Sequence, residues 1–202
     1  MGEAGTYAQR IDGPSDHELV SAAQSGDGEA LDRLLRRHQD RLYSVCRRLT
    51  GNDADALDAT QETLIAIVRG LPRYDARAAF STWAYRVATN ACLDELRRRK
   101  RRPEPGLPDR ETAPVAGGGD VGGGVADRLD VDAALAQLPA DFRAAVVLRD
   151  LCGLDYAEIG EVLGIPPGTV RSRIARGRAA LVPLLGQGRN PAPPDERPRP
   201  RP

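Results

Sequence analysis

Four arginines recur within one short segment near the C-terminal end of the sequence, "PPGTVRSRIARGRAAL", residues 166–181. No acidic residue stands among them. A guanidinium group is planar, permanently charged and suited to bidentate pairing with phosphate or with the edge of guanine. The segment is therefore either a solvated helix face or a surface for a negatively charged polymer. The elements around it decide between these two interpretations.

The residues that precede and include this segment predict a helix-turn-helix. A short helical pattern runs from Tyr156 to Leu163, Gly164 supplies a tight turn, and the segment Pro166 to Thr169 starts a longer helix. The longer helix has an apolar inner face made by Val170, Ile174 and Leu181. Gly177 allows this helix to approach its neighbour closely. Two helices joined by a brief turn are typical of DNA-binding modules whose second helix enters the major groove.

We expect the first exposed turns of the second helix to meet base edges, where arginine pairs with guanine. The candidates for these contacts are Gly168, Thr169, Arg171 and Ser172. The remaining basic residues are better placed for DNA phosphates, and they are Arg173, Arg176 and Arg178. Because the turn, the inner face and the outer face agree, we interpret the arginine-rich segment as a recognition helix.

A second basic stripe lies in "AFSTWAYRVATNACLDELRRRKRR", residues 79–102. From Arg86 to Arg102 there are seven basic residues and two acidic ones. One helix stripe combines an aromatic ring with polar and basic side chains, namely Trp83, Arg86, Asn90, Arg97 and Arg101. Such a stripe suits single-stranded nucleic acid, because cations contact the backbone and flat rings stack on unpaired bases. The alternative is that Trp83 belongs to the core and the arginines form a solvated helix end, favoured by the helix dipole.

An acidic stripe occupies the preceding helix, "DADALDATQETLIAIVRGL", residues 53–71. At about 100° per residue, one face carries Leu57, Leu64 and Val68. A neighbouring face carries Asp55, Asp58 and Glu62. The helix dipole favours acids in the first turn, which explains Asp53 and Asp55 but explains Glu62 less well. The functional interpretation is a docking stripe for a basic protein partner.

The composition predicts an all-α protein of two small helical domains. Aromatic residues make up 4% of the 202 residues, so the cores are built from Leu, Val, Ile and Ala. No alternating strand or hairpin signal stands out. We expect domains at 14–102 and 127–185. Between them, 103–126 has eleven Gly or Pro among 24 residues and predicts a flexible linker, and 186–202 predicts a disordered Pro/Arg tail.

Several function classes are excluded by what the sequence lacks. The three cysteines, Cys46, Cys92 and Cys152, show no C-x-x-C spacing, and His17 and His38 are isolated. We therefore expect no metal site, no disulfide framework and a reduced, cytoplasmic setting. No signal peptide and no apolar run of about 18 residues is present, so we expect no membrane insertion. Without a Ser/His/Asp set or a phosphate loop, we expect no catalytic residue, no cofactor and no enzyme activity.

Three segments together resemble the sigma-70 family of RNA polymerase sigma factors. They are "DATQETLIAIVRGL", "FSTWAYRVATNACLDELRRR" and "LPADFRAAVVLRDLCGLDYAEIGEVLGIPPGTVRSRIARGRAAL". Their order and spacing are similar to the small, two-domain extracytoplasmic-function (ECF) subfamily and its SigM-like actinobacterial group. The resemblance covers nearly everything except the linker and the tails. It implies sigma region 2 at 14–102 and sigma region 4 at 127–185, in a cytoplasmic protein that joins the nucleoid when bound to polymerase.

The resemblance implies a role for each surface. The "DATQET" helix is similar to the family helix that docks on the clamp helices of the polymerase β′ subunit, which implies contacts by Asp55, Asp58, Gln61 and Glu62. The loop 71–79 and the next helix resemble the part that melts the −10 element and captures a flipped base. The implied −10 contacts are Trp83, Arg86 and Asn90, with Arg97 and Arg98 on the DNA backbone. The second domain resembles the −35 reader, which also sits on the polymerase β flap.

The resemblance further implies an anti-sigma protein as a partner, besides core RNA polymerase and promoter DNA. Two other functions remain to be weighed. A conventional helix-turn-helix regulator would bind duplex DNA without polymerase, but it leaves the stripe of Asp58 and Glu62 and the stripe of Trp83 and Arg86 unexplained, and it usually needs a dimer. A regulatory enzyme with a fused DNA-binding module fits poorly with a first module that is small, helical and poor in histidine.

Overall fold

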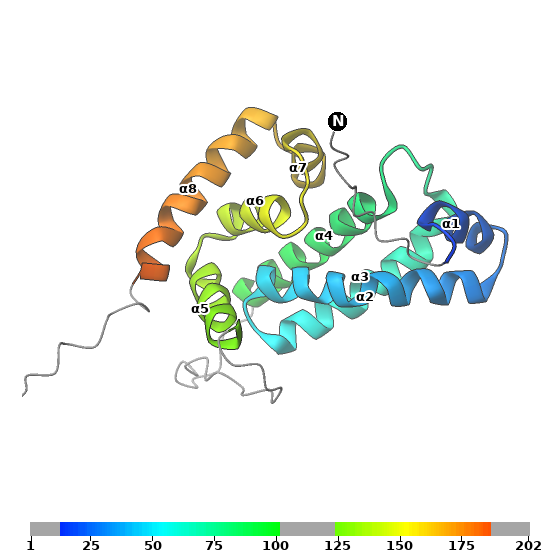
Figure 1. The fold of residues 1–202 in the computed structure, drawn as a ribbon, viewed down its shortest axis with the longest axis horizontal. Helices are drawn as coiled ribbons and strands as arrows, with labels where there is room; N and C mark the ends of the chain where they lie inside the picture. Colours follow the sequence, from blue (N-terminus) through cyan, green and yellow to red (C-terminus); the bar gives the residue numbers. More distant parts are fainter. Residues whose placement is uncertain (1–12, 102–123, 187–202) are drawn as a thin grey trace, which may run out of the picture.

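The computed structural model describes residues 13–101 and 124–186. Most of the predicted linker and the predicted tail after Gly186 lie outside these ranges, as do the first twelve residues, and Gly186 itself is the last residue of a helix. The described residues contain no strand, and the predicted all-α fold is confirmed (Figure 1). The helices are α1 (Asp16–Gln24), α2 (Gly28–Thr50), α3 (Asp53–Gly70), the short 3-10 helix η1 (Leu71–Arg73), α4 (Phe80–Arg101), α5 (Gly124–Gln137), α6 (Ala140–Asp150), α7 (Tyr156–Leu163) and α8 (Pro167–Gly186).

Local signals fix where the helices begin and end. A capping box begins α1, where the Ser15 hydroxyl accepts from the Glu18 amide at 3.3 Å and the Glu18 carboxylate accepts from the Ser15 amide at 2.7 Å. A second capping box, of Asp155 and Glu158, begins α7. Gly51 ends α2 with φ of 87°, a left-handed conformation that glycine adopts at little cost. The predicted linker extends to residue 126, whereas α5 already begins at Gly124.

In the first module α1, α2, α3 and α4 pack around a shared core. The buried side chains of α2 include Leu34, Leu42, Val45 and Leu49, which form its core face. The orientation of α3 is less obvious from the sequence. It buries Ala56, Ala59, Thr63 and Ile67, whereas Leu57 is 60% exposed and Val68 is 41% exposed. Small side chains on much of the inner face let α3 lie close to both α2 and α4, so three large apolar residues, Leu57, Ile65 and Val68, face outward.

The second module is organised around α6, whose side chains from Arg143 to Leu148 are all buried. The predicted helix-turn-helix is formed by α7 and α8, and Gly164 joins them with φ of 64°. The predicted close approach at Gly177 is also confirmed. A Cβ atom placed there would lie 2.6 Å from Val146 Cγ2 and 3.3 Å from the Phe142 carbonyl oxygen. Glycine at this position therefore brings α8 onto α6.

The variant Gly177→Ala is expected to destabilise the protein, although alanine favours helix. Overpacking costs about 1–3 kcal/mol and the higher helix propensity of alanine offsets about 1 kcal/mol, so we expect the free energy of unfolding to fall by up to about 2 kcal/mol. Urea unfolding followed by circular dichroism measures this. Gly168→Ala is the matched control, because no atom lies within 4 Å of its added Cβ. Equal stability of the two variants would contradict the packing argument.

The two modules share one continuous hydrophobic core, which the sequence does not indicate. The helices α5 and α6 lie on α2, and α7 lies on α4 (Figure 1). The predicted linker therefore joins two modules that are packed against one another in this structure.

Candidate nucleic-acid and polymerase interfaces

The predicted recognition helix α8 presents only part of its basic side chains to solvent. Arg171, Ser172 and Arg176 are exposed, and Thr169 is half-buried at the start of the helix. The Ser172 hydroxyl donates to the Thr169 carbonyl oxygen at 2.9 Å. The exposed Gly168 precedes them. These residues form one contiguous outer surface, as the helix-turn-helix pattern predicts.

Two arginines of α8 already have acidic partners within the chain. Arg173 Nη2 lies 3.0 Å from Asp141 Oδ2, and Arg178 Nε donates to Asp150 Oδ2 at 3.2 Å. Both arginines thereby tie α8 to α6. The pKa of the Arg178 guanidinium is raised by its hydrogen bond to Asp150. Within the part of the chain that the structure describes, no acid lies within 4.0 Å of the Arg171 or Arg176 guanidinium, so these two are the more available for an external anion.

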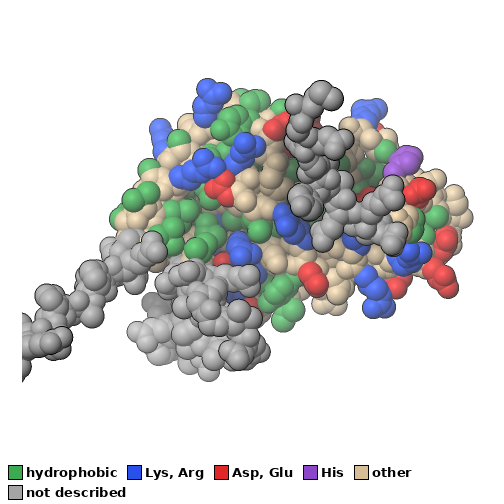
Figure 2. All heavy atoms as spheres, in the orientation of Figure 1, with side chains coloured by type: hydrophobic (Ala, Val, Ile, Leu, Met, Phe, Trp, Pro, Cys, Tyr) green, Lys and Arg blue, Asp and Glu red, His purple; other side chains and the backbone are tan. Residues whose placement is uncertain are grey.

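The surface of α8 divides into a basic and an apolar half. In Figure 2, basic side chains gather over the N-terminal half of this helix, and apolar side chains cover its C-terminal half. Val182 is 70% exposed and Leu185 is also exposed, past the point where α8 leaves α6. The first half suits DNA, and the second half suits an apolar protein surface.

A cluster of aromatic rings supports the stripe on α4. The Trp83 ring packs against the Tyr74 ring at 5.1 Å and the Phe80 ring at 5.7 Å between centroids. A Cβ on Gly70 would lie 3.0 Å from Trp83 Cζ2, so glycine makes room for the indole. Trp83 is half-buried, and thus it is both part of the module's packing and open to a ligand on its free side. The structure supports the core interpretation of Trp83 in part, and its role toward nucleic acid stays a prediction.

The loop between η1 and α4 is held by hydrogen bonds to its backbone. Gln24 Nε2 donates to the Leu71 carbonyl oxygen at 2.9 Å and to the Tyr74 carbonyl oxygen at 2.8 Å. The Tyr74 hydroxyl donates to the Ala78 carbonyl oxygen at 2.6 Å. Ala76 has φ of 56°, a left-handed conformation that is uncommon for a residue other than glycine. The sequence gives no signal for the part played by Gln24, because its partners lie about fifty residues away along the chain.

A cavity of about 400 Å³ opens between this loop and α4. Its polar and aromatic lining comes from Tyr74, Asp75, Arg77, Thr82, Trp83 and Arg86. Glu161 and Val162 of α7 close it on the other side. We call this the loop–α4 pocket. A ring at its wall with cations at its edge can accept a flat base and its phosphate.

The other predicted residues of α4 lie along its exposed side. Asn90, Arg97 and Arg98 are exposed. Arg97 Nη1 lies 2.8 Å from Asp94 Oδ1, and Arg98 Nη2 lies 3.1 Å from Glu95 Oε2. Exposed pairs of this kind contribute little, about 0–1 kcal/mol, so a nucleic acid can displace them.

On α3, Asp58, Gln61 and Glu62 are exposed and form one surface with the exposed Leu57 and Ile65. We call it the α3 surface. Its apolar members are residues that the sequence interpretation missed as functional candidates. The helix α3 contains more large apolar residues than its buried face can accommodate. A count of these residues in the sequence could therefore have indicated that some of them, such as Leu57 and Ile65, are exposed.

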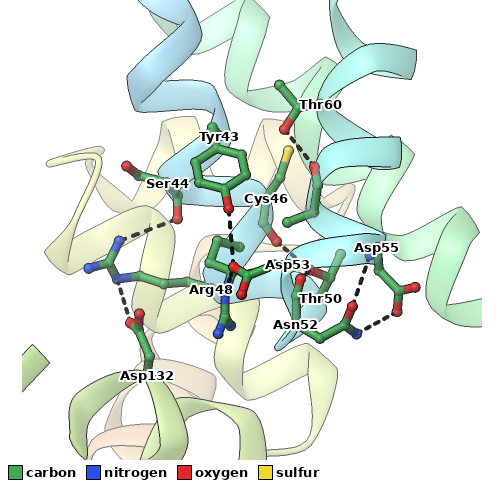
Figure 3. Close-up of polar contacts among 12 residues, drawn as sticks. Tyr43, Ser44, Cys46, Arg48, Thr50, Asn52, Asp53, Asp55, Thr60 and Asp132 are labelled. Carbon is green, nitrogen blue, oxygen red and sulfur yellow. Dashed lines mark hydrogen bonds and ion pairs between the residues drawn. The ribbon is translucent and has the colours of Figure 1, made fainter. Parts of the chain in front are cut away.

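Asp55 is engaged differently from the other two acids predicted to contact polymerase, Asp58 and Glu62. It is half-buried, and its backbone amide donates to Asn52 Oδ1 at 2.9 Å (Figure 3). Its carboxylate accepts from Asn52 Nδ2 at 2.7 Å and from Arg99 Nη1 at 3.2 Å. Asn52 therefore caps α3, and the Asp55 carboxylate ties α3 to α4, so Asp55 is less available to a partner than Asp58 or Glu62.

Two general findings concern the described residues alone. In these ranges no group of three or more His, Cys, Asp or Glu side chains is arranged to hold a metal ion. None of the helices between residues 13 and 101 or 124 and 186 is long and apolar enough to cross a membrane.

Comparison with known proteins decides the family. A model of sigma-70 region 2 matches residues 34–102, and a model of sigma-70 region 4 matches residues 128–181. The chain is 42% identical over 172 residues to the ECF RNA polymerase sigma factor SigM of Mycobacterium tuberculosis, covering 85% of each protein. This chain belongs to the ECF subfamily of the sigma-70 family. It is a sigma factor, which directs transcription from specific promoters.

Other relatives and solved structures agree with this assignment. The sigma factor is 44% identical over 182 residues to SigE of Mycolicibacterium smegmatis, covering 86% of this chain and 70% of that protein. The structure of CnrH in complex with the cytosolic domain of CnrY matches with a TM-score of 0.62 and 27% identity, covering 86% of this chain and 99% of that chain. A conventional helix-turn-helix regulator is not favoured, because it has no counterpart of region 2.

Proposed function

We propose that this sigma factor docks on core RNA polymerase through the α3 surface and reads a promoter at two places. The exposed start of α8 reads the −35 element as duplex. The loop–α4 pocket captures an unpaired base of the −10 element and so stabilises melted DNA. The protein acts by binding alone, and the chemistry of transcription belongs to the polymerase.

One observation supports this proposal over ordinary duplex binding. The loop–α4 pocket joins an aromatic wall, Trp83, to a basic edge, Arg86, on a helix outside the helix-turn-helix. An aromatic side chain cannot stack on the bases of an intact duplex, because those bases are stacked on one another. Stacking on an unpaired base contributes about 1–3 kcal/mol. A chain with a duplex reader and a separate single-strand pocket is suited to open DNA.

The proposed division of labour follows the two modules. Region 2, at 14–102, carries polymerase docking and −10 melting, with Asp58, Gln61 and Glu62 toward the β′ clamp helices and Asp55 in support. Region 4, at 127–185, carries −35 recognition and rests on the β flap. The exposed apolar end of α8, with Val182 and Leu185, suits that second docking. The segments 103–126 and 186–202 serve as linker and tail.

An anti-sigma protein is a further proposed partner. The related CnrH was solved with the cytosolic domain of CnrY, and RpoE of Bartonella quintana was solved with the anti-sigma factor NepR. We extend the same kind of partner to this sigma factor, acting in the cytoplasm.

Run-off transcription with purified bacterial core polymerase tests the proposal. The polymerase is supplied with and without this protein on a pool of promoters from its own genome. We expect defined start sites that depend on the protein, and alignment of their upstream sequences gives the −35 and −10 elements. Binding to duplex DNA without binding to core polymerase, and without new start sites, would overturn the proposal.

The variant Arg171→Ala is expected to weaken binding to the −35 duplex found in this way. A bidentate pair with guanine contributes about 1–3 kcal/mol, which corresponds to a loss of about 5–150-fold in affinity. The loss of affinity caused by Arg171→Ala should be smaller on a −35 duplex in which the guanine contacted by Arg171 is replaced by another base. Arg176→Ala is the contrast. Loss of a phosphate contact weakens binding to all DNA sequences alike, and it lowers the magnitude of the slope of log K against log salt concentration by about 1. Fluorescence anisotropy at several salt concentrations separates the two, and identical behaviour of both variants would contradict their assigned roles.

A further inference from the structure

Gln24 of α1 contacts the loop 74–79 beside the loop–α4 pocket but does not line the pocket itself. Its Nε2 nitrogen donates to the Leu71 carbonyl oxygen at 2.9 Å and to the Tyr74 carbonyl oxygen at 2.8 Å. A side-chain amide nitrogen carries two hydrogens, so both donors of Gln24 are used. The Leu71 carbonyl oxygen also accepts from the Tyr74 backbone amide at 3.1 Å. Gln24 therefore joins α1 to the residue that begins the loop.

Tyr74 is the residue through which this contact reaches the pocket. Its hydroxyl donates to the Ala78 carbonyl oxygen at 2.6 Å, so its side chain spans the loop. Its ring packs against the Phe80 ring at 6.0 Å and against the Trp83 ring at 5.1 Å between centroids. Because Tyr74 also lines the pocket, a fixed backbone at this residue fixes both the shape of the loop and the aromatic wall.

The loop has a conformation that its own residues do not favour. Ala76 has φ of 56°, in the left-handed region where a Cβ atom is crowded by the backbone. On the α1 side of the loop, a second cavity of about 460 Å³ is lined by Ala76, Ala78 and Asp16 among others. Among the described residues, a cavity therefore borders the loop on each side. Strained backbone persists only where surrounding contacts fix it, and the hydrogen bonds from Gln24 are such contacts.

We propose that Gln24 is a positioning residue for −10 recognition, because its two hydrogen bonds hold Tyr74 and the loop in the conformation that receives an unpaired base. The proposal rests on the function proposed above. Gln24 acts on the captured base only through the shape of the pocket. Without its hydrogen bonds the loop spends part of its time in other conformations, and the affinity for the base falls by the fraction of pockets that stay competent. Two hydrogen bonds of ordinary strength correspond to a factor of about 5 or more in such an equilibrium.

Three substitutions separate the hydrogen bonds of Gln24 from its volume. Gln24→Met keeps the length of the side chain and removes both donors. Gln24→Glu keeps the shape and replaces the donors by a carboxylate, which repels the two carbonyl oxygens. Gln24→Lys supplies an ammonium group with three donors. Gln24 is exposed, so none of these changes disturbs the core. Gln137→Glu makes the same change of charge at an exposed position of α5, at the opposite end of the molecule from α1 (Figure 1).

The binding experiment uses holoenzyme, formed from core polymerase and the full-length sigma factor, and fork-junction DNA. This DNA is duplex through the −35 element and carries the −10 element from the run-off experiment as an unpaired, fluorescein-labelled strand. A series of forks, each with an abasic site at one −10 position, identifies the captured base by the largest loss of affinity for the original protein. We call the affinity for the intact fork divided by the affinity for that abasic fork the base-capture ratio.

We expect Gln24→Met and Gln24→Glu to lower the base-capture ratio by a factor of about 5 or more, and Gln24→Lys and Gln137→Glu to leave it within a factor of about 2. On the abasic fork, Gln24→Met should bind as tightly as the original protein, because no base remains for the loop to receive. An unchanged ratio in Gln24→Met would overturn the proposal. Equal losses on both forks would also overturn it, because they would show a role in stability alone.

The fluorescence of Trp83 reports the state of the loop without DNA. Trp83 is the only tryptophan among the 202 residues, and the Tyr74 ring packs against its indole. In the sigma factor alone, we expect the constant for quenching by acrylamide to rise about 2-fold in Gln24→Met, because a loosened Tyr74 leaves the indole more open to solvent. Gln137→Glu should not change it. Equal quenching of Gln24→Met and the original protein would overturn the proposal, because the loop would then not depend on Gln24.

Failure of the proposed function gives a different result from failure of this inference. If the original protein loses no affinity with an abasic site at any −10 position, the loop–α4 pocket captures no base, and the proposed function itself fails. If the original protein shows that loss and Gln24→Met shows it equally, base capture stands and the positioning role of Gln24 is refuted.

Discussion

Replacement of Asp58 and Glu62 together by arginine is expected to abolish transcription from promoters that depend on this sigma factor. Both carboxylates are exposed on the α3 surface, so their loss removes no internal contact of the fold. Like charges placed across an interface cost several kcal/mol, which corresponds to a loss of about 100-fold or more in affinity for a basic partner. Run-off transcription and surface plasmon resonance with immobilised core polymerase measure the two effects.

A matched control carries the same change of charge on another helix. Asp32→Arg with Asp40→Arg replaces two exposed acids of α2, and we expect it to transcribe normally. Binding of the −35 duplex should be unaffected in both double variants. Polymerase binding that survives in Asp58→Arg with Glu62→Arg would show that the α3 surface is not the docking site.

The apolar members of the α3 surface explain why reversal is a sharper test than neutralisation. Leu57 is exposed beside Asp58, and Ile65 is exposed one turn beyond Gln61. Their burial on binding contributes affinity that alanine at Asp58 or Glu62 would leave in place. Arginine at both positions adds repulsion to the loss of attraction, so the apolar contact can no longer form.

The variant Trp83→Ala is expected to reduce the formation of open promoter complexes by about 10–100-fold. The lost stacking on an unpaired base accounts for about 1–3 kcal/mol. Permanganate reactivity of thymines in the −10 element measures open complexes directly. Binding to the −35 duplex should not change, because α8 lies in the other module.

The packing of Trp83 requires a control for stability. The ring contacts Tyr74 and Phe80, and truncation of a packed aromatic residue costs about 3–5 kcal/mol when it is fully buried. Val45→Ala lowers the stability of the same module at a site with no exposure, and we expect it to melt promoters normally at temperatures where it stays folded. Trp83→Phe keeps an aromatic face and should retain most of the activity. If Val45→Ala and Trp83→Ala fail equally, the indole acts only through stability.

Much of the fold follows from local features of the sequence. The helix boundaries at Ser15, Gly51 and Gly164 come from residues that satisfy or release backbone groups within a few positions of themselves. The helix-turn-helix and the inner face of α8 follow from side-chain periodicity along one element. These properties need no knowledge of the rest of the chain, and the structure agrees with them.

The sequence also indicates which surfaces are candidates, but it cannot indicate how available each residue is. Arg173 and Arg178 look equivalent to Arg171 and Arg176 in the sequence. Only the packing of α8 on α6 gives the first two acidic partners, one of them 28 residues away. In the same way, the fit of α3 between α2 and α4 decides that small residues face inward and Leu57 faces the solvent.

The sequence by itself determined an all-α chain with two modules, a helix-turn-helix whose second helix is basic, and two further charged stripes, because caps, turns and periodicity act over short distances. Only the tertiary structure decided that the modules share a core and that α7 closes the pocket beside Trp83. The contacts responsible join residues that are 76 positions apart for Thr82 and Glu158 and 94 apart for Leu49 and Arg143. Such pairs depend on how whole helices pack, and no local pattern in either segment encodes its partner.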